Sequence, residues 1–268
     1  DAATVSDPSI VWIPKKLSLE SVQKAWEVMN YGQTAVLSLV IAVTSTLAAC
    51  LSCSLVGYGL SRYKFAERNV LFFIVILMIV VPPYTILIPS YMNFRFFDIL
   101  GLLRLFPALT GGNGYINLAE YPQSVLTFVL PSLFATGLRS GLFIFIFRQT
   151  FLGMPKDLEE AACIDGCGPF RILTSIIIPM CKPGIVTVCM ISAMAAWNEY
   201  PVALVMVTDP TKATLPVGLA NLYEIQRYAT DWGALFAALV LALIPTVILF
   251  IVGQKQLVQG LSVGGVKG

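Results

Sequence analysis

The chain has 268 residues, of which 57% are hydrophobic and only 12% are charged, and its mean hydropathy is +0.81. A soluble domain carries about 25% charged residues, so this composition excludes a soluble enzyme and a disordered chain. The net charge of +2 excludes a surface that follows nucleic-acid phosphates. Because the chain has no histidine, it also lacks His–metal sites and His-activated nucleophiles. The composition predicts an all-α protein that crosses a lipid bilayer several times.

Five apolar segments reach the length of about 20 residues that a helix needs to cross a bilayer. The predicted spans are 34–60, 70–88, 124–147, 184–207 and 233–252. Pro82 and Pro83 predict a broken helix near the outer end of the second span, and Pro201 predicts a disturbance in the fourth. Pro131, Gly137 and Pro245 are either kinks or tolerated packing features.

Lysine and arginine concentrate in the cytoplasmic loops of membrane proteins. Here they concentrate after the first span, after the third span and in the tail 254–268. We therefore expect these three segments to be cytoplasmic, and the segments 1–33, 93–123 and 208–232 to be external. An external segment 1–33 requires an earlier crossing, so we expect five spans in this chain and six in the intact protein.

Six cysteines are spread over the predicted spans and cytoplasmic segments, and none lies in an external segment. They are Cys50, Cys53, Cys163, Cys167, Cys181 and Cys189. A disulfide framework is therefore not expected. The spacing of Cys50 and Cys53 is compatible with a metal or redox pair, but the apolar surroundings favour small packing residues.

The cytoplasmic loop 153–179 has the most informative pattern. Pro155 suits the first turn of a helix, and the acidic residues that follow it are favourable near a helix N-terminus. Gly166 suits the left-handed position that ends a helix, and Gly168 with Pro169 turns the chain into a second helix. The loop therefore predicts two short helices joined at an angle. Its alanine-rich face favours docking to another protein, and an ordinary helix–turn–helix between two spans is the alternative.

The spacing of this loop resembles the EAA loop of ABC importer permeases. Glu160-Ala161-Ala162 is followed after three residues by Gly166, and after nine more by Ile176-x-Ile178-Pro179. Only Ile178 departs from the family pattern, where leucine is usual. The runs 57–65, 197–200 and 260–268 are also similar to carbohydrate-importer permeases of the maltose type, so the resemblance covers essentially the whole chain.

The resemblance implies a polytopic helical bundle of the type I ABC importer kind, with residues 1–268 forming one permease domain. It implies a second permease subunit, forming a heterodimer, two cytoplasmic ATPases that bind ATP and Mg, and an external substrate-binding protein. It also implies a bacterial inner-membrane location with the C-terminus in the cytoplasm. The implied ATPase-coupling residues are Glu159, Glu160, Ala161, Ala162, Asp165 and Gly166. The implied ATPase-contacting residues of the tail are Gly264, Gly265 and Lys267.

No residue of this chain is expected to hydrolyse ATP, because it has no glycine-rich phosphate loop. We expect no catalytic residue, no metal and no cofactor within the chain itself, and no nucleic-acid partner.

Polar residues within predicted spans are costly and are functional candidates. The candidates for a translocation cavity are Arg139, Trp197, Asn198, Glu199 and Tyr200. Sugars are bound by planar polar groups and aromatic faces, which this set offers. The alternative is that Arg139 pairs with Glu199, or with a helix end, to support packing between subunits.

Two other functions compete with the importer hypothesis. A self-contained secondary transporter or channel predicts internal repeats and acidic residues for ion coupling, yet Glu199 is the only acid well inside a predicted span. A membrane-embedded enzyme needs a nucleophile–base or metal pair that the predicted spans do not offer. Neither competing function requires the pattern of loop 153–179.

Overall fold

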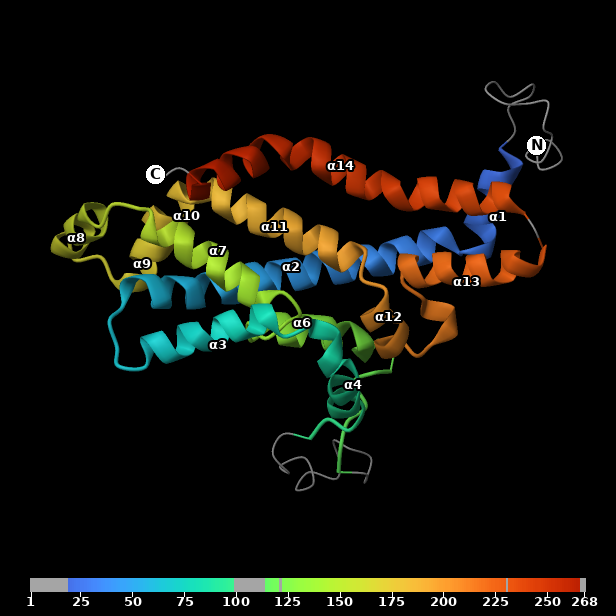
Figure 1. Ribbon diagram of the computed structural model, residues 1–268, viewed down its shortest axis with the longest axis horizontal. Helices are drawn as coiled ribbons and strands as arrows, with labels where there is room; N and C mark the ends of the chain where they lie inside the picture. The colour runs from blue at the N-terminus through green and yellow to red at the C-terminus, as the bar shows by residue number, and fades with distance from the viewer. Residues whose placement is uncertain (1–18, 99–113, 121, 230, 266–268) are drawn as a thin grey trace. The chain divides into compact units, whose positions relative to one another are not determined.

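The computed structural model describes residues 19–98, 114–120, 122–229 and 231–265 (Figure 1). Over these ranges helices are the only extended regular elements, and they are joined by turns and an isolated antiparallel bridge between Phe97 and Ile116. The described residues form two compact units. The first unit contains the described residues within 1–41, 91–125 and 196–248, and the second contains those within 42–90, 126–195 and 249–268.

The second unit is built around long apolar helices and contains the loop 153–179. Its main elements are α2 (Tyr31–Arg62), which begins in the first unit, α3 (Arg68–Val80), α6 (Leu126–Leu133), α7 (Ser140–Leu152) and α11 (Lys182–Trp197). Shorter helices in the loop are α8 (Asp157–Ile164), α9 (Pro169–Ile172) and α10 (Ile178–Met180), with a π-helical turn at Leu173–Ile177 between the last two.

Two glycines allow α7 to approach its neighbours closely. A Cβ atom on Gly57 of α2 would lie 2.7 Å from the Cβ of Phe147, and one on Gly141 would lie 2.9 Å from the carbonyl oxygen of Val75 in α3. Both distances are below ordinary van der Waals contact. The α2–α7 and α3–α7 crossings therefore require residues without side chains, as is common where membrane helices pack.

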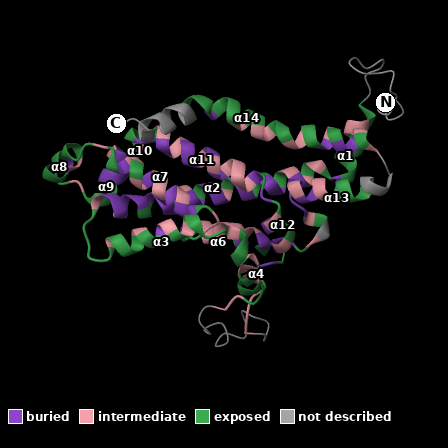
Figure 2. Ribbon diagram, viewed as in Figure 1, coloured by how far each residue is buried: buried purple, intermediate pink, exposed green. Residues whose placement is uncertain are grey.

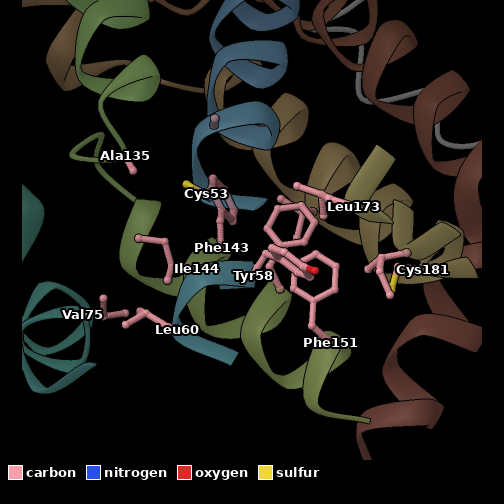
Figure 3. Close-up of a cluster of buried hydrophobic side chains, with 14 of the residues drawn as sticks. Cys53, Tyr58, Leu60, Val75, Ala135, Phe143, Ile144, Phe151, Leu173 and Cys181 are labelled. Carbon is pink, nitrogen blue, oxygen red and sulfur yellow. The ribbon is translucent and has the colours of Figure 1, made fainter. Parts of the chain in front are cut away.

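The core of the second unit lies where α2, α7 and the loop meet (Figure 3). Phe147 and Phe151 are fully buried, and their rings stack with centroids 5.9 Å apart. The ring of Tyr58 meets that of Phe151 edge-on. Ala162 of α8 and Ile172 of α9 belong to the same cluster, so the loop is packed against the helices rather than extended away from them.

The prolines break the second predicted span as the sequence indicates. Helix α3 ends at Val80, and a 3₁₀ turn at Pro83–Ile86 leads into α4 (Leu87–Arg95). The two parts are bent by 94°. Proline cannot donate the backbone hydrogen bond that a continuous helix needs at this point.

The third predicted span, 124–147, is not one helix. A 3₁₀ turn at Gln123–Val125 leads into α6, which ends at Leu133, and α7 starts at Ser140 and continues to Leu152, beyond the predicted end. Ala135 adopts a left-handed φ of 56° in the intervening break. The amide of Thr136 then donates to the carbonyl of Pro131 at 2.8 Å, which closes the end of α6.

The first unit consists of shorter helices and the first part of α14. Its elements are α1 (Glu20–Val28), α12 (Pro201–Met206), a 3₁₀ turn at Pro210–Lys212, α13 (Leu215–Ala229) and α14 (Trp232–Gly265), whose end belongs to the second unit. Its hydrophobic cluster contains Ala25, Trp197, Leu215, Leu222 and Ala238. The side chains of Lys24 in α1 and Asp231 before α14 form an ion pair at 2.5 Å.

Two described helices are long and apolar enough to cross a membrane, namely Tyr31–Arg62 and Trp232–Lys255. The number rises to four if the bent pairs Arg68–Val80 with Pro83–Arg95 and Pro169–Met180 with Lys182–Trp197 each count as one span. The five spans of this chain, and which segments face each side of the bilayer, stay predictions.

Exposed large apolar side chains are frequent on the long helices α2, α3 and α14 (Figure 2). The most apolar window of α14 is only 11% buried, whereas that of α2 is 56% buried.

Candidate functional site

The predicted coupling loop forms the two short helices that its sequence indicates. Helix α8 begins after Lys156, with three acidic residues in its first turn. It ends in a Schellman motif, because the amide of Gly166 donates to the carbonyl of Cys163 and the amide of Cys167 donates to that of Ala162. The φ of Gly166 is +78°, which confirms the predicted left-handed end. Pro169 then opens α9 at the position where a missing N–H is tolerated.

Most of the predicted coupling residues lie on the exposed side of α8 (Figure 2). Glu160, Ala161, Asp165 and Gly166 are exposed. Two apolar side chains next to them are also exposed, Leu158 at 42% and Ile164 at 87%. This face combines carboxylates with unburied apolar groups, a composition that suits contact with a second protein.

Ala162 and Glu159 point to the other side of α8. Ala162 is 6% exposed and packs in the core cluster of the second unit. The Oε1 atom of Glu159 lies 2.6 Å from Nε of Arg62, at the last turn of α2. The Oε2 atom of the same carboxylate accepts a hydrogen bond from the hydroxyl of Tyr58 at 3.3 Å. Glu159 is therefore held within the chain, one residue away from the exposed Glu160.

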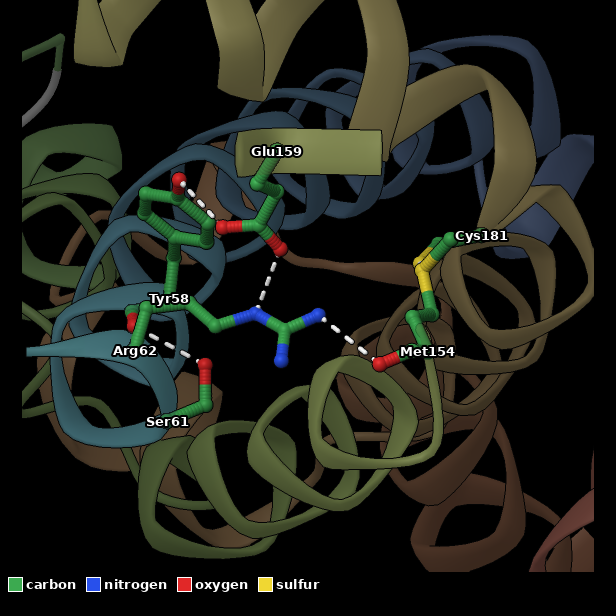
Figure 4. Close-up of polar contacts among 6 residues, drawn as sticks. All are labelled: Tyr58, Ser61, Arg62, Met154, Glu159 and Cys181. Carbon is green, nitrogen blue, oxygen red and sulfur yellow. Dashed lines mark hydrogen bonds and ion pairs between the residues drawn. The ribbon is translucent and has the colours of Figure 1, made fainter. Parts of the chain in front are cut away.

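Figure 4 shows how the Arg62 guanidinium contacts both α8, at Glu159, and the segment that precedes α8, at Met154. While Nε faces Glu159, Nη2 donates to the carbonyl oxygen of Met154 at 3.2 Å. The side chain of Arg62 is only 6% exposed and that of Glu159 only 14% exposed. A buried ion pair of this kind cannot lose one member without leaving an uncompensated charge.

The sequence alone does not indicate that Tyr58 and Arg62 contact the loop. In the sequence, Arg62 counts only among the basic residues after the first span, and Tyr58 only as a member of the run 57–65. The available signal was their i, i+4 spacing, which puts both side chains on one face of a helix. Their partner Glu159 lies 101 positions from Tyr58 along the chain, and no local pattern indicates that distance.

The predicted cavity residues near Trp197 lie at a helix break. Helix α11 ends at Trp197, and α12 starts with Pro201 at its first position, so the fourth predicted span is interrupted where proline predicts it. Trp197 is buried and donates its indole N–H to the carbonyl of Ala242 at 3.3 Å. Glu199 is also buried, and its carboxylate accepts from the amide of Val202. Asn198 and Tyr200 are exposed.

Arg139 belongs to the second unit, whereas the four residues from Trp197 to Tyr200 belong to the first. It is exposed and immediately precedes α7, at the end of the break that follows α6. Arg139 therefore lies at the start of a helix, whereas the sequence predicted a position within a continuous span.

The predicted tail residues have little described structure. The backbones of Gly264 and Gly265 form the end of α14, and Lys267 lies outside the described residues. All six cysteines are free thiols. The sulfur of Cys50 lies 3.1 Å from that of Cys189, a proximity between α2 and α11 that the sequence does not indicate. The described residues contain no group of three histidine, cysteine or acidic side chains that could hold a metal.

Comparison with known proteins places this architecture in a family. The arabinooligosaccharides transport system permease protein of Halalkalibacterium halodurans is 34% identical over 238 residues, which are 89% of this chain and 74% of that protein. The melibiose/raffinose/stachyose import permease protein of Bacillus subtilis is 32% identical over 263 residues, which are 98% and 86% of the two chains.

A solved structure has the same fold. It is a bacterial ABC transporter involved in the import of the acidic polysaccharide alginate. The TM-score is 0.73 at 21% identity, and the match covers 94% of this chain and 84% of that one. Residues 53–263 match the binding-protein-dependent transport system inner membrane components. The chain therefore belongs to this family, as a permease component of an ABC importer that is not itself the catalytic subunit.

Proposed function

We propose that this chain is the permease subunit of an ATP-driven importer for a carbohydrate in the bacterial cytoplasmic membrane. It works with a second permease subunit, two cytoplasmic ATPases and an external substrate-binding protein. The ATPases hold the ATP and Mg, and the C-terminal tail lies on their side of the membrane. The sugar relatives support the substrate class, since their names specify arabinooligosaccharides and melibiose, raffinose or stachyose.

The observation that carries this proposal is the exposed face of α8. Its carboxylates and apolar side chains project from a helix whose opposite side is packed into the core of the second unit. A short helix held in this way has a fixed orientation, so a groove on an ATPase can bind it without first ordering it. Glu160, Ala161, Asp165 and Gly166 would be the contacting residues, and Gly264, Gly265 and Lys267 would make a second contact.

The test is co-purification of the chain with candidate ATPase and permease subunits from the same cell. Glu160→Lys reverses a charge on the exposed face, and Gly166→Pro removes the left-handed turn that ends α8. We expect both variants to lose the ATPase and to keep the permease partner. Glu67→Lys is the matched control, because Glu67 is exposed in a different loop that the sequence predicts to be cytoplasmic. If the unmodified chain binds no ATPase and moves solute alone in liposomes, the chain is a secondary transporter or channel.

We also propose that the helix break at 198–200 faces the translocation cavity. Asn198 and Tyr200 are the exposed side chains there and offer an amide and an aromatic face to a sugar. Trp197 and Glu199 hold the break in place through their contacts with Ala242 and Val202. Arg139 is the remaining candidate, and unchanged transport by an Arg139→Gln importer would remove it from the cavity.

A further inference from the structure

The coupling loop has a buried polar attachment to α2, on the side of α8 opposite its exposed face. Tyr58 and Arg62 are one turn apart on α2, and both contact the carboxylate of Glu159 in α8. Arg62 also contacts the carbonyl of Met154, where α7 leads into the loop. Arg62 therefore holds both the entry to the loop and its first helix, and Tyr58 adds a second contact to that helix (Figure 4).

The geometry of this attachment is restrictive. The charged atoms are 2.6 Å apart, and the guanidinium is almost completely buried. The neighbouring Ala162 is in the apolar cluster with Tyr58 and Phe151, so α8 cannot slide without breaking both polar and apolar contacts. A packed contact of this kind transmits displacement, because it shifts between discrete arrangements and does not deform continuously.

We propose that Tyr58, Arg62 and Glu159 are positioning residues that make α8 and the last turn of α2 one rigid joint, so that displacement of α8 by a docked ATPase moves α2. This inference rests on the proposed function. It assigns the adjacent glutamates different tasks, with Glu160 contacting the partner and Glu159 passing the movement into the permease. We call the three residues the α2–α8 latch.

The experiment uses the complete importer, with its binding protein, both permease subunits and ATPases, in liposomes. It measures sugar transported per ATP hydrolysed, together with retention of the ATPase. Glu159→Gln and Arg62→Gln should keep the ATPase bound and lower the transport-to-hydrolysis ratio by about fivefold, and Tyr58→Phe should lower it by about twofold. Lys64→Gln is the control, because Lys64 is an exposed cation two positions beyond Arg62, and its ratio should be unchanged.

Two double variants separate a transmitting latch from a merely stabilising one. Exchanging the charges, with Arg62→Glu and Glu159→Arg, keeps the ion pair and should restore the ratio to within about twofold of the unmodified importer. Replacing both, with Arg62→Met and Glu159→Gln, leaves no unpaired buried charge but removes the attachment, so the ratio should stay low. Tyr58→Phe removes a single hydroxyl, so it decides the matter if the single charge variants do not assemble.

Three results would overturn the latch. The first is a normal ratio in the variant that replaces both charges, and the second is loss of transport and hydrolysis in equal proportion. The third is loss of the ATPase from the Glu159→Gln complex, which would place Glu159 in the docking face. An unmodified complex that neither retains an ATPase nor transports sugar would instead overturn the proposed function, and the latch with it.

Discussion

The two units each contain an ion pair that joins distant parts of the chain, but the pairs differ in burial. In the second unit, Arg62 and Glu159 have side chains that are 6% and 14% exposed. In the first unit, Lys24 and Asp231 lie equally close, yet the lysine side chain is 50% exposed. Water therefore competes for the ammonium group of Lys24 but hardly reaches the guanidinium of Arg62. Distance alone therefore says little about an ion pair, and burial predicts that removing one partner costs more in the second unit.

The largest predicted effect comes from breaking the buried pair. Arg62→Gln leaves Glu159 charged and enclosed, so we expect the permease to lose about 3 kcal/mol of stability. The matched change in the first unit, Lys24→Gln, should cost less than about 1 kcal/mol. Thermal unfolding of the detergent-solubilised complexes measures both. Equal losses would mean that burial does not separate the two pairs.

A second difference between the units is how closely their helices approach. Gly57→Ala would place a methyl group 2.7 Å from the Cβ of Phe147, and we expect a loss of about 1–3 kcal/mol from overpacking. In the first unit, a Cβ on Gly218 would be 3.4 Å from the nearest atom, in Thr34, which is ordinary contact.

Gly218→Ala should therefore be neutral or slightly stabilising, because alanine favours a helix over glycine. Gly59→Ala is the closest control, since it lies on the same helix with nothing within 4 Å of the added atom. If Gly57→Ala melts at the same temperature as Gly59→Ala, the α2–α7 crossing is looser than described.

A smaller effect is expected within the loop, where two exposed glycines differ in backbone conformation. An added Cβ meets nothing at either Gly166 or Gly168, but Gly166 has a φ of +78° and Gly168 one of −71°. Gly166→Ala should cost about 1 kcal/mol and weaken ATPase binding by several-fold. Gly168→Ala should bind normally. Titrating the purified ATPase against both variants measures this, and equal weakening would mean that conformation at Gly166 is not what matters.

The smallest effect concerns acid sensitivity of the first unit. The hydrogen bond from Lys24 is the main cause that lowers the pKa of Asp231 below its usual value. A carboxyl group with a lowered pKa stabilises the fold above its unfolded pKa of about 4, and this contribution is lost as the pH falls through the lowered pKa. Wild type should thus melt slightly higher than Asp231→Asn at pH 7, and the difference should shrink as the pH falls below about 4. A difference that stays constant over this range would show that Asp231 acts through something other than its charge.

Local signals in the sequence predicted several features well. Gly166 ends α8 in the left-handed conformation, Pro201 interrupts the fourth predicted span, and Pro82 with Pro83 bends the second predicted span. Each feature depends on the backbone limits of glycine or proline, which hold whatever the rest of the chain does. The helical fold and the family followed from composition and from the fixed spacing of the loop.

Features that depend on contacts between distant residues were not predicted. Ala135 gives no sign that it takes a left-handed φ, because alanine usually continues a helix. The carboxylate of Glu159 is next to Glu160 in sequence but turns toward Tyr58, 101 positions away. Similarly, the sulfur of Cys50 lies 3.1 Å from that of Cys189, 139 positions away, and no local pattern indicates this proximity. Which residue fills the space beside a helix depends on packing that one sequence does not display.

The opposite orientations of Glu159 and Glu160 have a consequence for exchanging subunits between importers. When this permease is paired with a foreign ATPase, the positions to adapt are on the exposed side of α8, namely Leu158, Glu160, Ala161, Ile164 and Asp165. Position 159 must instead be matched to position 62 of the same chain, whatever the ATPase. Transplanting the loop alone would separate Glu159 from its arginine, so a working chimera needs the last turn of α2 to be carried over with it.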